Sequence, residues 1–144
     1  MPKCYFLCVS AGSSVDQQSN NVTLFNLVEQ INVPPGAPPP PRNSVPLEVH
    51  AYFHIAPEEL GTTFEFRFVM VAPSGLETPS EPVTHKPVTV RYRTRTLGLP
   101  FPPVVGHYTL CVDTRVLGNV GYRRDSVTWP VTIAEAERRP KITH

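Results

Sequence analysis

A chain of 144 residues with 40% hydrophobic and 17% charged residues is long enough for one domain with a sizeable core, and its composition excludes an intrinsically disordered protein. Its formal net charge of +1 provides no overall field that would attract nucleic acid or an anionic membrane. The 18 prolines exclude a protein built from long helices, because proline breaks helix interiors, and they favour short strands joined by stiff loops.

The N-terminal part of the chain predicts a β-hairpin followed by a proline-rich connector. The apolar run at 3–10 is a first strand, too short for a secretory signal. A turn rich in Gly, Ser, Asp and Asn separates it from a longer apolar run at 21–33, which suggests a bulged second strand. The proline-rich segment 34–46 is interpreted as a rigid connector between sheets. A ligand for an SH3- or WW-type groove is its functional alternative.

Four later segments alternate apolar and polar residues, with the period of two that half-buried antiparallel strands require. They lie at 47–55, 62–72, 88–97 and 127–133, and a further strand is expected at 104–115. In the first of them the polar residues Glu48, His50, Tyr52 and His54 are expected to face solvent. The last contains Pro130, which lacks an N–H group, so this strand is expected at a sheet edge or at a bulge.

About seven strands with turns between them predict an all-β fold, a single antiparallel β-sandwich that is immunoglobulin-like in outline. The sandwich domain is assigned to residues 1–134, and a charged C-terminal tail to 135–144. Gly106 and Tyr108 are spaced as in the tyrosine corner of such sandwiches. The three cysteines, an odd number with no C-x-x-C motif, indicate reduced, buried thiols and a cytoplasmic protein.

The sequence contains no pattern typical of catalysis or of metal binding. His50 and His54 are about 13 Å apart on a strand, at ~3.3 Å per residue, so one zinc ion cannot bind both. Neither a G-x-S-x-G nor an H-E-x-x-H motif is present, and no glycine-rich loop precedes a helix. We therefore expect a protein that is not an enzyme and uses no metal and no cofactor.

Arg91, Arg93 and Arg95 form a stripe on one face of the strand at 88–97, at intervals of about 6.7 Å. Three interpretations stay open. The stripe is a solvated face paired with Glu48 or Glu65 on a neighbouring strand, or a surface for a protein partner, or a row of contacts to nucleic acid phosphates next to a stacking tyrosine. The residues of the candidate binding site are Arg91, Arg93, Arg95, Glu48, His50, Tyr52 and His54.

Two short motifs resemble those of a family of small bacterial proteins of unknown function. They are SVDQQSNNVTLFNLVEQI at 14–31, between an apolar strand and a proline-rich run, and GHYTL at 106–110. The resemblance implies a cytoplasmic β-sandwich and transfers no catalytic residue. The residues that carry it are Ser14, Asp16, Leu24, Phe25, Asn26, Gly106 and Tyr108.

The leading functional hypothesis is a protein-interaction or structural module that binds a protein partner or itself. It would use the arginine face or an edge strand such as 127–133. A nucleic-acid-binding module that uses the arginine stripe is the alternative. A small-ligand protein or an enzyme is a third possibility, and it requires a pocket that collects His50, His54 or Glu48. No membrane partner is expected.

Overall fold

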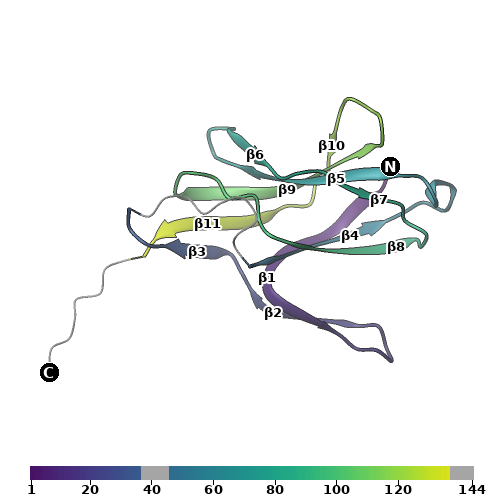
Figure 1. The fold of residues 1–144 in the computed structure, drawn as a ribbon, viewed down its shortest axis with the longest axis horizontal. Helices are drawn as coiled ribbons and strands as arrows, with labels where there is room; N and C mark the ends of the chain where they lie inside the picture. Colours follow the sequence, from purple (N-terminus) through teal and green to yellow (C-terminus); the bar gives the residue numbers. More distant parts are fainter. Residues whose placement is uncertain (37–45, 137–144) are drawn as a thin grey trace, which may run out of the picture.

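The computed structural model describes residues 1–36 and 46–136, and within these ranges the chain forms two β-sheets packed together (Figure 1). One sheet has four strands in the order β2-β1-β4-β8. The other has seven, with the path β3-β11-β9-β5-β6, β10 paired to β9 and β7 paired to β5. The predicted all-β sandwich is confirmed, but it contains these eleven strands instead of about seven.

The strand bounds show where the additional strands arise. The four-stranded sheet consists of β1 (Lys3–Val15), β2 (Val22–Leu27), β4 (Glu48–His54) and β8 (Arg91–Leu97). The seven-stranded sheet consists of β3 (Gln30–Val33), β5 (Phe64–Val71), β6 (Glu77–Pro79), β7 (Val83–His85), β9 (Gly106–Val116), β10 (Arg123–Arg124) and β11 (Trp129–Glu135). The short strands β6, β7 and β10 lie between the strands that the sequence predicted.

A short 3₁₀ helix at Pro57–Glu59 follows β4. Among the described residues, no helix is long and apolar enough to cross a membrane. Most of the proline-rich segment 34–46 and of the predicted tail lies at 37–45 and 137–144, outside the described residues. Strand β11 itself continues to Glu135, one residue past the predicted end of the domain.

The apolar run at 21–33 forms two strands in different sheets, not one bulged strand. Strand β2 pairs antiparallel with β1, and β3 pairs parallel with β11. Near the end of β2, Asn26 has a φ of 50°, a left-handed conformation that turns the chain out of the strand direction. The parallel β3–β11 pair is the one exception to the predicted antiparallel arrangement among the strand pairs of the described ranges.

Strand β11 is not at an edge, so the prediction of an exposed edge at 127–133 is wrong. It lies between β3 and β9. Pro130 is tolerated because pairing with β3 begins only at Thr132, whose N–H donates to the carbonyl of Glu29 at 2.7 Å. The N–H that Pro130 lacks would point to the same side two residues earlier, before β3 begins.

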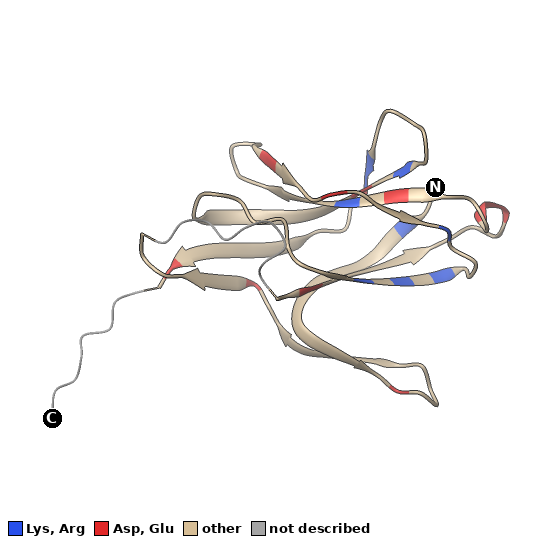
Figure 2. Ribbon diagram, in the orientation of Figure 1, with Lys and Arg blue, Asp and Glu red and all other residues tan. Residues whose placement is uncertain are grey.

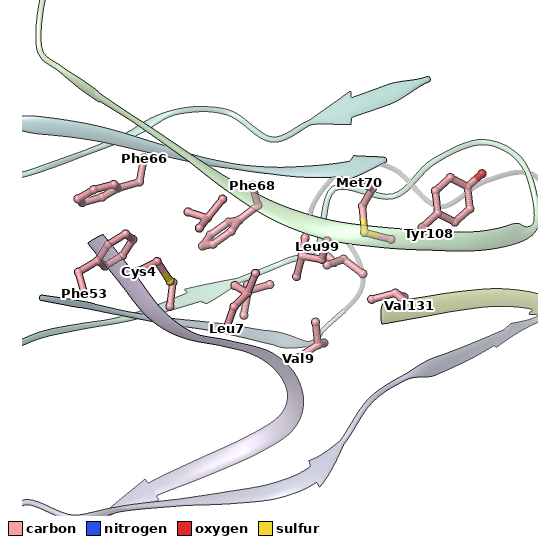
Figure 3. Close-up of a cluster of buried hydrophobic side chains, with 14 of the residues drawn as sticks. Cys4, Leu7, Val9, Phe53, Phe66, Phe68, Met70, Leu99, Tyr108 and Val131 are labelled. Atoms are coloured by element: carbon pink, nitrogen blue, oxygen red, sulfur yellow. The ribbon is translucent and has the colours of Figure 1, made fainter. Parts of the chain in front are cut away.

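The core lies between the two sheets, and Figure 3 shows side chains from both of them meeting there. Phe53 of β4 stacks on Phe66 of β5 with ring centroids 4.3 Å apart. The hydroxyl of Tyr108 donates to the carbonyl of Val104 at 2.5 Å, which is the contact expected of a tyrosine corner. All three cysteines are free and buried, and burial raises the pKa of the Cys4 thiol to about 12.

Candidate functional site

The β1–β2 hairpin curls over the outer face of the four-stranded sheet. Strand β1 pairs with β4 from Lys3 to Ser10 and then with β2 from Ser10 to Val15. The hydroxyl of Ser13 donates to Oε1 of Glu48 at 2.6 Å, which fastens the hairpin to β4. In Figure 1 the hairpin diverges from β4 and β8 toward its tip.

The turn at the hairpin tip is held by Asp16, one of the residues behind the family resemblance. Its carboxylate accepts hydrogen bonds from the backbone N–H groups of Gln18 at 2.8 Å and Ser19 at 3.3 Å. These bonds hold the pKa of Asp16 below its usual value. Asn20 follows with a φ of 60°, which asparagine tolerates better than most residues. Asp16 therefore has a structural role in the turn.

A groove separates the hairpin from the sheet face. It consists of two hollows of about 240 Å³ and 340 Å³ that share Asn20, Tyr52 and Arg93. We call it the basic groove. Its floor is formed by His50, Tyr52, Arg91, Arg93 and Arg95 of β4 and β8, and the hairpin side by Ser13, Val15, Ser19, Asn20, Asn21 and Val22. The hairpin side thus contributes hydroxyl and amide groups together with two valines, and the floor contributes guanidinium groups.

The strand register brings most of the predicted site residues together. His50 is opposite Arg95, Tyr52 opposite Arg93, and His54 opposite Arg91. Figure 2 shows the three arginines as blue segments along β8. His54 is exposed and lies at the end of the row, where it is also opposite Lys3 of β1.

Glu48 is not on a solvated face, as the alternation predicted, because the hairpin covers it. Only 5% of this residue is exposed. Arg95 Nε donates to its Oε1 at 2.7 Å, and the hydrogen bond from Arg95 holds the pKa of Glu48 below its usual value, despite the opposing effect of burial. The suggested pairing of Glu48 with the stripe is thus present. Glu65 instead pairs with Arg115 in the other sheet, at 2.6 Å.

His50 is also buried, with 2% of its surface exposed, so its predicted solvent exposure is wrong for the same reason. Its Nε2 lies 2.9 Å from Oγ of Ser10 and 3.4 Å from Oε1 of Glu48. Burial lowers the pKa of the imidazole. A catalytic triad requires the acid at Nδ1 and the serine at Nε2. Here both groups approach Nε2, and Ser10 is completely buried, so this cluster anchors the hairpin.

Arg91 and Arg93 differ from Arg95 in their partners. Within residues 1–36 and 46–136 neither guanidinium group lies within ion-pair distance of a carboxylate. The guanidinium carbon of Arg93 lies 6.0 Å from the ring centroid of Tyr52, and Tyr52 contacts the ring of the exposed Tyr5 edge-on at 6.2 Å. Two solvated cations next to aromatic rings can receive an anionic ligand.

A second arginine cluster, which the sequence did not indicate, lies on the outer face of the seven-stranded sheet. The ring of Tyr122 lies between two guanidinium groups, with those of Arg67 and Arg115 at 4.1 Å and 4.2 Å from its centroid. The buried carboxylate of Asp113 receives Arg67 at 3.1 Å and Arg124 at 2.9 Å. The facing pairs Glu65–Arg115 and Arg67–Asp113 on β5 and β9 would have revealed it if the strand pairing had been known.

No protein-family model, curated protein or solved structure matches this chain. The resemblance to small bacterial proteins therefore stays a prediction.

Proposed function

We propose that this protein is a non-enzymatic interaction module whose basic groove binds an acidic segment of a partner protein. The observation that carries this proposal is that Arg91 and Arg93 lie on a preformed groove without carboxylate partners in the described part of the chain. The free and buried cysteines support a reducing, cytoplasmic compartment for this interaction.

Two features of the groove suit it to carboxylates: its walls are held in place before a ligand binds, and its floor carries guanidinium groups. Arg95, Glu48 and Ser13 tie the hairpin to the sheet, so a ligand meets walls that are already in place, and less entropy is lost on binding. Planar guanidinium groups bind carboxylates through two parallel hydrogen bonds. Asn20 and Ser19 on the hairpin side add neutral hydrogen-bonding groups.

A protein partner is favoured over nucleic acid by the charge of the chain. A nucleic-acid-binding domain usually carries a clearly basic balance, whereas the net charge here is +1. Glu48 also lies at the end of the arginine row, where it neutralises Arg95. Tyr52 and Tyr5 are the feature that favours nucleic acid, because bases stack on such rings, so single-stranded oligonucleotides belong in the test.

The test is a titration, followed by fluorescence anisotropy, with a labelled peptide of alternating glutamate and threonine. Arg93→Glu should weaken binding about tenfold or more, since a charge-assisted hydrogen bond contributes ~1.5–3 kcal/mol. Lys86→Glu, which makes the same charge change at an exposed site outside the groove, is the matched control.

Equal binding to wild type and Arg93→Glu would refute the proposal. Tight, salt-sensitive binding of a labelled single-stranded oligonucleotide, with none of the peptide, would assign the groove to nucleic acid instead.

A further inference from the structure

Strand β8 presents a free backbone edge among the described residues. It is the last strand of its sheet and pairs only with β4. The N–H of Ile55 donates to the carbonyl of Val90 at 2.8 Å, and the N–H of Gly98 donates to that of Leu47 at 2.9 Å. Backbone groups alternate sides along an antiparallel strand. The N–H and C=O groups of Arg93, Arg95 and Leu97 therefore point away from β4.

The inner side of this edge opens between the two sheets. A cavity of about 210 Å³ lies there, lined by Thr94 and Thr96 of β8 and by Phe66 and Phe68 of β5. The segment from Ser80 to His85 adds Ser80, Glu81, Val83 and His85 to the lining. His85 Nδ1 lies 2.7 Å from the hydroxyl of Tyr92, a bond that joins β7 to β8 near the start of the free edge. Beyond that bond, the apolar part of the lining consists of the exposed Val83 and of the edges of the mostly buried Phe66 and Phe68.

The outer face of β8 thus carries the arginine stripe, and its inner face borders the opening between the two sheets. A strand added to this edge would point alternate side chains to the arginine face and the others over the opening. The pair of Arg95 with Glu48 at 2.7 Å shows that a glutamate on the strand next to β8 reaches an arginine of the stripe. A glutamate on an added strand would approach Arg93 from the other side with comparable geometry.

We propose that the acidic partner segment binds as an additional β-strand on β8, and that it alternates acidic with apolar residues. Its carboxylates would pair with the arginines, its apolar side chains would enter the opening between the sheets, and its backbone would bond to Arg93, Arg95 and Leu97. This proposal rests on the proposed function of the basic groove and adds the conformation and sequence pattern of the partner.

The experiment compares two labelled peptides, one of alternating glutamate and valine and one of alternating glutamate and threonine. They share charge, side-chain shape and preference for strands, and they differ in the cost of burying a hydroxyl group. We expect the valine peptide to bind about tenfold more tightly, because its methyl groups are buried in the opening.

Leu97→Pro tests the backbone contact, because it removes an outward N–H group while keeping all three arginines, and proline is tolerated at edge positions. We expect it to abolish the preference for valine, whereas Leu97→Ala, which keeps the N–H, should retain most of it. Hydrogen exchange of wild type is the second measurement, and the amides of Arg93 and Arg95 should become protected when the valine peptide binds.

The outcomes separate the two proposals. Equal affinity for both peptides, lost in Arg93→Glu and without amide protection at β8, would overturn strand addition and keep the basic groove. Failure of both peptides to bind would overturn both proposals. A dimer of the free protein in light scattering that Leu97→Pro dissociates would show that a second copy occupies the edge, and would overturn the assignment to a separate acidic partner.

Discussion

The outer faces of the two sheets both carry arginines, but in different electrostatic settings. On the seven-stranded sheet Arg67, Arg115 and Arg124 each contact a carboxylate, and Tyr122 is held between two of them. On the four-stranded sheet, within the described ranges, only one of the three arginines of β8 has such a contact. A paired cluster of this kind can stabilise the fold, whereas solvated cations in a groove are available to a ligand. The two faces differ in whether their arginines contact carboxylates, more than in how many arginines they carry.

The strongest test of this comparison is Asp113→Asn. Asp113 is buried and receives Arg67 and Arg124, so its loss leaves two guanidinium groups without their shared carboxylate. We expect the free energy of unfolding to fall by about 2–4 kcal/mol, as measured by urea denaturation. A loss below the error of the urea measurement would show that the paired cluster does not support the fold.

Glu48→Gln tests the one ion pair of the arginine stripe, because Glu48 binds both Ser13 of the hairpin and Arg95 of β8. We expect a loss of about 1–3 kcal/mol at neutral pH. Since the pKa of Glu48 is lowered in the folded state, its contribution is present above the ordinary glutamate pKa of about 4.3 and is lost as the pH falls through the lowered value.

Urea denaturation of wild type and Glu48→Gln at a series of pH values measures this contribution directly. The difference between the two proteins should shrink below about pH 4.3. A difference that stays constant down to the most acidic condition would contradict the role given to the Glu48 carboxylate.

The smallest expected effect is that of Arg93→Gln on stability. Its side chain has no carboxylate partner in the described ranges, and its guanidinium carbon lies 6.0 Å from the ring centroid of Tyr52. The free energy of unfolding should change by less than about 0.5 kcal/mol, while binding of the acidic peptide weakens. A large loss of stability in the same urea assay would place Arg93 with the structural arginines.

The periodicity of the sequence was sufficient to predict the strands but not what covers them. The alternation at 47–55 correctly identified Val49, Ala51 and Phe53 as core residues. It also placed Glu48 and His50 in solvent, because a period of two gives the two faces of a strand and contains no information about a distant hairpin that lies on one of them.

Long-range pairing accounts for the other differences. The run at 21–33 is continuous in composition, and only the partners β1 and β11 divide it between two sheets. The missing N–H of Pro130 correctly predicted that this residue has no partner strand on that side. It did not predict that β11 as a whole is internal, because β3 pairs only with the later residues of β11. The arginine stripe is visible in the sequence because it lies within one strand, whereas the Arg67–Asp113 cluster is assembled from several.

The crossing of the chain between the sheets has a mechanical consequence for the groove. At the base of the hairpin, Trp129 Nε1 of β11 donates to the carbonyl of Val28 at 2.8 Å, and part of the way along it Ser13 is bonded to Glu48. The hairpin is thus fixed to the rest of the fold at its root and, through Ser13, at one point further along. These two fixed points keep the root of the hairpin at a constant height above β4, so the spacing of the groove there is set by the fold before a ligand enters.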